Sequence, residues 1–307
     1  MTTRSPWQIS EPDAATILQR YPDPLRALAS AEVPALVFRQ AFAPTACQAL
    51  MRRLVREELL YDPGQPAPEA FRERAIPEGY YREGRSAENR YAWESAASTG
   101  KARIDIGTSL GYRGSDLDSF LTHSQETHAL FARLFAGGDD PVKTLYGALQ
   151  SVAGGKRVMT AREPDGREYG PAIIRAHYGG YTYAPHFDSV RLREKRSDYA
   201  VHDFEHQFAG VLVLQNAQRD GLSAQCTLHR CLWEPEIDPY LRTRSFHDYA
   251  RSNDIENVTV DLEPGDLYFF NTRCIHEVPG VDGELPRVVV ATFIGWDEGR
   301  DEIYVWS

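Results

Sequence analysis

From Ile173 onward the chain is a succession of short runs rich in β-branched and aromatic residues, separated by turn residues. Runs of this length and composition indicate β-strands. The first half shows helical periodicity instead, as in Pro44–Leu60, where apolar residues recur every three or four positions. We therefore predict an α+β, mainly β fold, a jelly roll with helices from the N-terminal half packed on one sheet. The expected strands are Ile173–Tyr178, the His186 region, Phe208–Gln215, Cys226–Trp233, Val258–Leu262, Leu267–Asn271 and Arg287–Trp296.

The first half supplies the expected helices and two further strands. Thr45 is the expected N-cap of the helix Pro44–Leu60. Residues 157–174 are expected to form a hairpin that turns at Pro164-Asp165-Gly166. The other expected helices are Asp13–Arg20, Asp116–Phe135 and Pro141–Val152, and the other expected strands lie within Val33–Phe42 and Ala102–Ile106.

A His-x-Asp triplet lies in the segment YGGYTYAPHFD, at His186 and Asp188. In an extended segment, side chains two residues apart point to the same face, so this imidazole and this carboxylate lie side by side. A histidine next to an aspartate is most often only hydrogen-bonded to it. His276, in GDLYFFNTRCIHEVPG, is the best candidate for a third ligand. Two histidines and one carboxylate form the facial triad of non-haem Fe(II) oxygenases, which leaves coordination positions open.

Arg287 follows His276 by eleven residues and begins the run RVVVATFIGW. A guanidinium binds a carboxylate through two parallel hydrogen bonds and keeps its charge. With the triplet and the Pro-Gly-Asp turn before His276, this pattern resembles the Fe(II)/2-oxoglutarate-dependent dioxygenases. YGGYTYAPHFD is similar to the corresponding segment of collagen prolyl hydroxylases. The resemblance covers residues 173–295 and implies a cupin-like double-stranded β-helix.

The resemblance implies a ligand set and a cosubstrate. Fe(II) would be bound by His186, Asp188 and His276. 2-Oxoglutarate and O2 would occupy its remaining coordination positions, and ascorbate would be a supporting reductant. Arg287 would bind the far carboxylate of 2-oxoglutarate. Many family members carry Ser or Thr two residues after this arginine, where this chain has Val289. Tyr178, eight residues before His186, is the expected substitute, and a core aromatic is its alternative reading.

Asp188 bears on the type of reaction. In related halogenases the carboxylate position holds Gly or Ala, and chloride binds the iron there. The carboxylate of Asp188 therefore favours hydroxylation, or another radical outcome such as desaturation, over halogenation. The substrate would be a small molecule such as an amino acid or a natural-product intermediate, and the products would include succinate and CO2.

The formal net charge of −10 and the pI near 5.4 argue against a nucleic-acid partner and against adhesion to anionic membranes. No apolar run reaches the length of a membrane span, and the first residues lack an apolar signal core. We expect a cytoplasmic protein; the sequence leaves its oligomeric state undefined.

We expect one domain over residues 1–307: residues 1–155 as mostly helical support and residues 156–307 as the jelly-roll core with the metal site. Residues 62–102 are irregular and are either a surface excursion or a lid. Arg175 and Arg191 are either surface residues or contacts for a substrate carboxylate. The expected contact residues of the lid are Tyr80, Tyr81, Arg82, Arg85, Arg90 and Trp93.

Two alternatives remain at this point. One is an oxygenase that uses the same triad without 2-oxoglutarate. The other is a jelly-roll binding or regulatory protein that keeps the metal site without turnover. Arg287 favours the 2-oxoglutarate enzyme over both.

Overall fold

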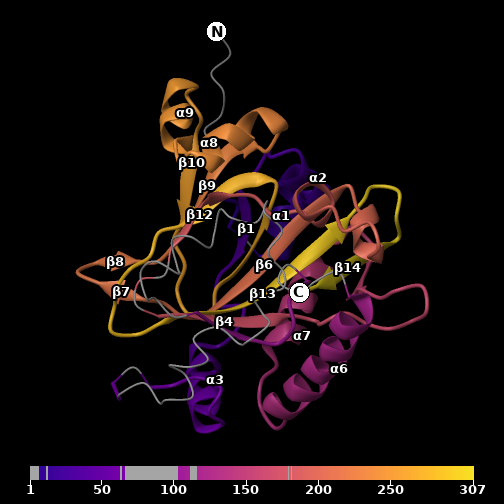
Figure 1. Cartoon of the computed structure of the whole chain (residues 1–307), viewed down its shortest axis with the longest axis vertical. Helices are drawn as coiled ribbons and strands as arrows, with labels where there is room; N and C mark the ends of the chain where they lie inside the picture. The colour runs from indigo at the N-terminus through magenta and orange to yellow at the C-terminus, as the bar shows by residue number, and fades with distance from the viewer. Residues whose placement is uncertain are drawn as a thin grey trace.

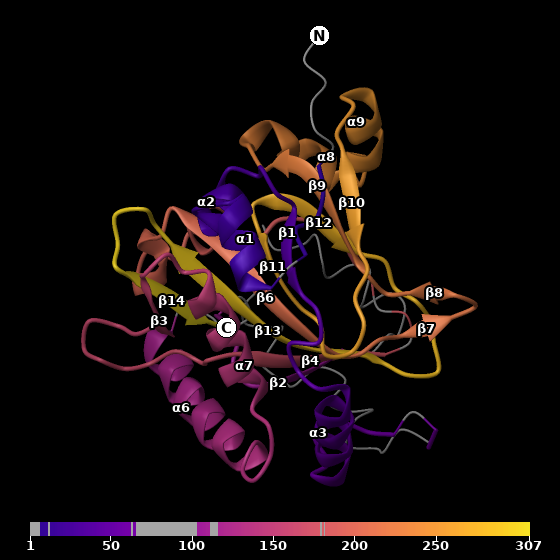
Figure 2. The same cartoon turned by 180° about the vertical axis from the view of Figure 1, so that it is seen from behind.

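Two β-sheets pack face to face in the computed structural model of the chain (Figures 1 and 2). The structure describes residues 7–11, 13–62, 64–65, 103–110, 116–178, 180 and 182–307. The strands of the large sheet are β1 (Ala35–Phe38), β2 (Arg103–Ile106), β3 (Arg157–Thr160), β4 (Ile173–His177), β6 (His206–Gln215), β11 (Leu267–Asn271), β13 (Arg287–Trp296) and β14 (Glu302–Trp306). Those of the small sheet are β5 (Tyr183–His186), β9 (Cys226–Leu232), β10 (Asn257–Val260) and β12 (Cys274–Val278).

Within the described residues the large sheet runs β1-β11-β6-β13-β14-β3, with β4 paired to β13 and β2 to β4. The small sheet runs β10-β9-β12-β5. Apolar side chains of both sheets meet between them, among them Val211 and Val213 of β6, Leu228 of β9 and Val260 of β10. Alternation along each strand sends one set of side chains into this layer and the other set outward. The expected α+β jelly roll, a double-stranded β-helix, is confirmed.

Helices cover the outer face of the large sheet, as expected. They are α1 (Ala14–Arg20), α2 (Pro24–Ala29), α3 (Pro44–Arg56), α6 (Leu117–Leu134) and α7 (Pro141–Ser151). Leu50 of α3 and Leu145 of α7 pack in one cluster with Val288 and Val290 of β13. Because Val289 faces the other way, toward the small sheet, β13 separates a helix-covered face from the face between the sheets.

Two local predictions differ from the structure, in the N-cap of α3 and in the extent of a hairpin. Ala43, not Thr45, is the N-cap of α3, and its side chain makes no capping hydrogen bond. The predicted turn at Pro164-Asp165-Gly166 is present, with an antiparallel bridge between Arg162 and Glu168. The hairpin extends no farther, because β3 pairs in parallel with β14 and β4 pairs with β13. The two strands expected in the first half, β1 and β2, are confirmed and join the large sheet.

A helical cap absent from the prediction covers the outer face of the small sheet. It consists of α8 (Asp238–Arg242) and α9 (Phe246–Ser252), which lie at the opposite end of the molecule from α3 and α6 (Figures 1 and 2). Leu241 and Phe246 pack there with Phe187 and Ile275. The cap therefore packs against the strands that carry the predicted ligands, on the side of the small sheet away from the large sheet.

The expected lid, residues 62–102, lies outside the described residues apart from Asp62, Gly64 and Gln65, and all of its named contact residues lie outside them. No helix in the described parts of the chain combines the length and the apolar character needed to cross a membrane.

Candidate active site

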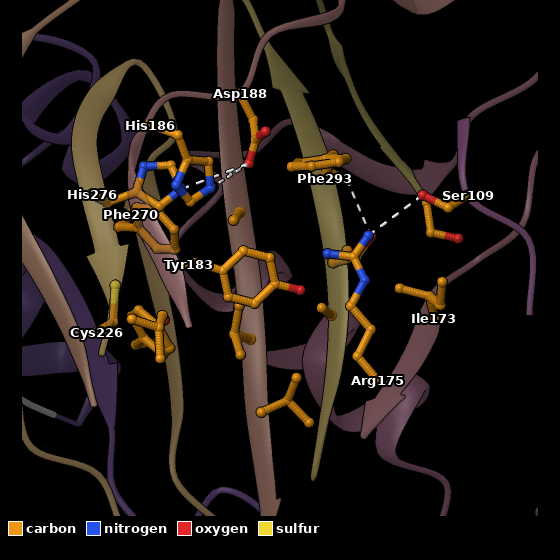
Figure 3. A pocket seen from close by; sticks show the side chains of 18 of the residues that line it. Ser109, Ile173, Arg175, Tyr183, His186, Asp188, Cys226, Phe270, His276 and Phe293 are labelled. Carbon is orange, nitrogen blue, oxygen red and sulfur yellow. Dashed lines mark hydrogen bonds and ion pairs between the residues drawn. The ribbon is translucent and has the colours of Figure 1, made fainter. Parts of the chain in front are cut away.

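The three predicted metal ligands converge at one end of the small sheet (Figure 3). His186, the last residue of β5, lies directly opposite His276 of β12 in the antiparallel ladder. Their rings are 4.2 Å apart between centroids. Oδ2 of Asp188 lies 3.7 Å from Nε2 of His186 and 3.6 Å from Nε2 of His276. Residues separated by about ninety positions in the chain thus present two nitrogens and one oxygen to one point.

Backbone carbonyls fix the tautomers of both histidines. Nδ1 of His186 lies 2.8 Å from the carbonyl oxygen of Ala184, and Nδ1 of His276 lies 2.9 Å from that of Cys274. A carbonyl only accepts, so each Nδ1 carries the proton and donates it. Each Nε2 is then left with a lone pair on the side of Asp188, the arrangement that metal-binding histidines adopt.

Asp188 is held by its backbone and by one of its carboxylate oxygens. Its N–H donates to the carbonyl of Thr272, and the Thr272 hydroxyl donates to the carbonyl of Asp188. The Arg193 guanidinium donates to Oδ1 at 2.8 Å and to the Phe187 carbonyl at 2.6 Å. A π-helical turn, Val190–Glu194, brings Arg193 back to this position, and Ser189 caps it by accepting from the Leu192 N–H. Oδ2 is thereby left for a metal.

Burial and neighbouring charges set the protonation of the triad. Burial, with His276 close by, lowers the pKa of His186 to about 3, so its imidazole is neutral at pH 7. Burial alone would raise the pKa of Asp188, but the adjacent His276, His186 and Arg193 together lower it below its usual range. A neutral imidazole and an ionised carboxylate are the forms that bind a metal cation.

These observations fit a divalent metal ion such as Fe(II). The three donor atoms, two nitrogens and one oxygen, all lie within 4.8 Å of one another and would hold such an ion, with its other coordination positions left for a cosubstrate and oxygen. When bound, such an ion supplies the oxygen-activating chemistry. The chain supplies the ligands and the buried surroundings.

Arg287 lies in the same pocket as the triad and is 6% exposed. Its Nε atom is buried and has no hydrogen-bond partner among the described residues. Buried donors are rarely left unsatisfied, so this atom fits a ligand that arrives from outside the chain. Val289, two residues on, lines the same wall, as the strand alternation predicts.

Tyr268 of β11, rather than the predicted Tyr178, has its hydroxyl next to Arg287. Its side chain lines the pocket, and its hydroxyl adjoins the Arg287 guanidinium and the Cys226 thiol. Burial raises the pKa of Tyr268 well above its ordinary value, so the phenol is protonated and is a donor. Tyr268 could not be identified from the sequence, because its place opposite the triad depends on how β11 pairs with β6.

The structure does not bring Tyr178 to the pocket. Its ring is stacked on Tyr61 at 4.2 Å between centroids, and its hydroxyl donates to the Tyr61 carbonyl at 3.1 Å. Its side chain packs in the cluster beneath the helices, on the other face of the large sheet. The alternative reading, a core aromatic, describes its place, because Tyr178 has the opposite strand parity to His177, which does line the pocket.

Arg175 of β4 lines the pocket across from the triad, beside Ser109 (Figure 3). Its Nη2 lies 3.4 Å from the Ser109 hydroxyl, and its Nε lies 3.8 Å from Oδ1 of Asp105. Arg191, the other arginine weighed from the sequence, is exposed and does not line this pocket. The apolar lining includes Phe270, which lies against the ring of His276, and Phe293, which lies between Asp188 and Arg175 (Figure 3).

A family model described as "Carrier-protein-independent halogenase WelO5" matches residues 11–307 of the chain. The chain belongs to this family. It is therefore an enzyme of the Fe(II)/2-oxoglutarate-dependent oxygenase class that acts on small molecules. This decides between the alternatives that the sequence left open, in favour of the 2-oxoglutarate-dependent enzyme.

Solved structures with similarity to the chain share little sequence with it. An N-substituted L-amino acid dioxygenase from Burkholderia ambifaria AMMD is 16% identical, with 96% of this chain and 91% of that chain covered and a TM-score of 0.48. A prolyl-4-hydroxylase from Pseudomonas putida is 11% identical, with 91% and 96% covered and a TM-score of 0.37. A search of curated protein sequences gave no match.

Proposed function

We propose that this enzyme hydroxylates a C–H bond of a small molecule at an Fe(II) ion bound by His186, Asp188 and His276. Oxidative decarboxylation of 2-oxoglutarate to succinate and CO2 would accompany the reaction. The observation that carries the proposal is the place of Asp188, whose Oδ2 lies 3.6–3.7 Å from both Nε2 atoms. With a carboxylate as third ligand, the position that a halide needs on the metal is taken.

Halogenation is the second candidate, because the matched family is named for a halogenase. It would require a halide to bind in addition to Asp188 or to displace it. The ion pair from Arg193 to Oδ1 holds the carboxylate in place and opposes displacement. Hydroxylation is therefore the reaction that these residues support better.

In this proposal Arg287 and Tyr268 bind the far carboxylate of 2-oxoglutarate. A guanidinium with a free buried Nε and a protonated phenol together offer the donors that a carboxylate accepts. Tyr268 takes the part that a Ser or Thr at position 289 plays in many relatives of this type.

Arg175, at the far end of the pocket, is the proposed contact for an anionic group of the substrate. The apolar wall that includes Phe270 and Val211 would hold the substrate's carbon skeleton and exclude water. A small molecule with a carboxylate, such as an amino acid or a biosynthetic intermediate, matches a pocket with one apolar wall and one arginine end.

The first experiment is an anaerobic titration of Fe(II) and then 2-oxoglutarate into the metal-free protein. We expect the weak visible absorption near ~500 nm that a chelated 2-oxo acid gives on an Fe(II) site with open positions. Iron binding without this band would contradict the cosubstrate assignment, and no iron binding would contradict the triad.

The second experiment separates the two reactions. The iron-loaded enzyme is supplied with 2-oxoglutarate, air and a panel of amino acids and natural-product intermediates, with and without chloride or bromide. Mass spectrometry should detect oxygen insertion in both conditions. A halogenated product in the presence of halide would overturn the proposal in favour of the second candidate. Omission of ascorbate from parallel reactions tests whether this reductant supports turnover.

A further inference from the structure

A second group of two imidazoles and one carboxylate lies on the outer face of the small sheet. Nε2 of His229 lies 3.0 Å from Oε1 of Glu277, and Nε2 of His247 lies 3.3 Å from Oε2 of the same carboxylate. One donor atom from each of the three residues lies within 4.8 Å of the other two. Among the described residues, these two histidines are the ion partners of Glu277.

Strand geometry separates this group from the active site. His276 and Glu277 are consecutive in β12, so their side chains point to opposite faces of the sheet. Glu277 is paired with Thr227 in β9, and His229 lies two residues farther along β9 on the same outer face. The active site lies between the sheets, whereas His229 and Glu277 point toward the helical cap.

The third residue comes from that cap. His247 is in α9, which lies beside β9 and β10 (Figures 1 and 2). The neighbouring Phe246 packs its ring edge-on against His229, with 5.0 Å between centroids and 85° between planes. Three separate elements, two strands and a helix, therefore supply the three side chains.

The three side chains differ in their exposure to solvent, which increases from His229 to Glu277 to His247. His229 is 4% exposed, Glu277 13% and His247 51%. Two donors are thus held rigidly in the protein, and the third lies where a cation and a water molecule have access from solvent. A site of this kind is built before the ion arrives and closes with the movement of one surface side chain.

We propose that His229, His247 and Glu277 bind a divalent transition-metal ion, in the first instance Zn²⁺, which ties α9 to the small sheet. Two imidazoles, a carboxylate and a water molecule are a common ligand set for tetrahedral zinc. Bonds of ~2.0–2.1 Å place neighbouring ligand atoms about 3.3 Å apart in a tetrahedron. Each imidazole lies at about this distance from one oxygen of Glu277, 3.0 Å from Oε1 for His229 and 3.3 Å from Oε2 for His247, so the carboxylate can bind an ion placed between the two rings. Each imidazole would then carry its proton on Nδ1 and offer its Nε2 lone pair to the ion.

The same distances suit a metal-free network in which each imidazole donates its Nε2 proton to Glu277. The hydrogen-bonded network binds no zinc, whereas the proposed site binds one zinc ion, so the measured number of bound zinc ions distinguishes them. The proposal does not depend on the oxygenase reaction, because the site shares no ligand with the triad.

The test uses the His186→Ala/Asp188→Ala protein, in which His276 is the one ligand of the active-site triad that remains. Zinc binding is measured by competition with a chromophoric zinc chelator, together with the melting temperature with and without Zn²⁺. We expect one tight equivalent of zinc and a rise in melting temperature, since an ion that binds only the folded state stabilises it. Adding His247→Ala should weaken this binding at least ~100-fold and remove the rise.

His202→Ala in the same background is the matched control, because His202 is also a partly exposed histidine next to a carboxylate, Asp203. It should leave the zinc equivalent intact. His247 lies at the surface, and circular dichroism checks that its replacement leaves the fold unchanged. Zinc binding that is absent from the His186→Ala/Asp188→Ala protein, or that survives His247→Ala unchanged, would overturn the proposal. Loss of the oxygenase reaction alone would not affect it.

Discussion

Arg193 donates a 2.8 Å hydrogen bond to Oδ1 of Asp188, while Oδ2 of the same carboxylate faces the Nε2 atoms of His186 and His276. One oxygen is thus held by the protein and the other is left for a metal. The guanidinium also donates to the Phe187 carbonyl, so the π-helical turn that carries Arg193 is fixed to the segment that carries Asp188. The geometry of the third ligand therefore depends on a residue that binds no metal itself.

Replacement of Arg193 by Gln should weaken Fe(II) binding by about 10- to 100-fold, the usual cost of losing a residue that orients a ligand. The apparent Kd from anaerobic Fe(II) titration is the measurement. Arg191→Ala, two residues earlier and exposed, is the control and should bind iron like the wild type. Equal iron affinity in the Gln variant would show that Asp188 is oriented by its backbone alone.

Replacement of Asp188 by Ala should abolish hydroxylation, because it removes the carboxylate ligand and leaves a two-histidine site whose vacated position is open to chloride or water. Product formation is followed by mass spectrometry and turnover by succinate release. Retained hydroxylation at the wild-type rate would remove Asp188 from the ligand set.

Replacement of Arg287 by Ala should raise the 2-oxoglutarate concentration for half-maximal turnover by about 10- to 100-fold, since hydrogen bonds to charged groups contribute about 1.5–3 kcal/mol. Arg287→Lys should recover only part of the loss, because an ammonium group lacks the two parallel N–H bonds of a guanidinium. An unchanged half-saturation in both variants would refute the anchor assignment.

Two tyrosine variants test whether Tyr178, predicted from the sequence, or Tyr268, found in the structure, binds 2-oxoglutarate beside Arg287. Tyr268→Phe should raise the half-saturating 2-oxoglutarate concentration several-fold, in line with one hydrogen bond of about 0.5–1.5 kcal/mol. Tyr178→Phe should leave it unchanged and should instead lower the free energy of unfolding by a similar amount, because its hydroxyl bonds Tyr61. The reverse pattern would restore Tyr178 to the cosubstrate site.

His177 gives a prediction for the pH dependence of stability. Burial, reinforced by the charges of Arg287, Arg103 and Arg175, lowers the pKa of His177 well below its ordinary value of 6.5. Below pH 6.5 the imidazole of His177 binds a proton in the unfolded chain but stays neutral in the folded protein. The free energy of unfolding therefore falls as the pH falls. Denaturant titrations of His177→Gln should show a slope smaller by up to about 1.4 kcal/mol per pH unit just below pH 6. An identical slope would mean that His177 is protonated in the folded state.

The amino-acid sequence by itself determined which side chains share a face near the candidate metal site. His186 and Asp188 are two residues apart in an extended segment, so strand alternation alone places them on one face. The strand parity of β13 likewise placed Arg287 and Val289 on the pocket side. These conclusions held because they depend on local periodicity, which the residue types specify without help from distant parts of the chain.

Only the tertiary structure decided which distant residues meet. It put His276 opposite His186, brought Tyr268 rather than Tyr178 to Arg287, and gathered His229, His247 and Glu277 from two strands and a helix. It also paired β3 with β14, which limits the local hairpin to the residues around the bridge between Arg162 and Glu168. Each of these depends on strand register and on which face a helix covers. The burial of the whole apolar core sets both, and local spacing does not encode them.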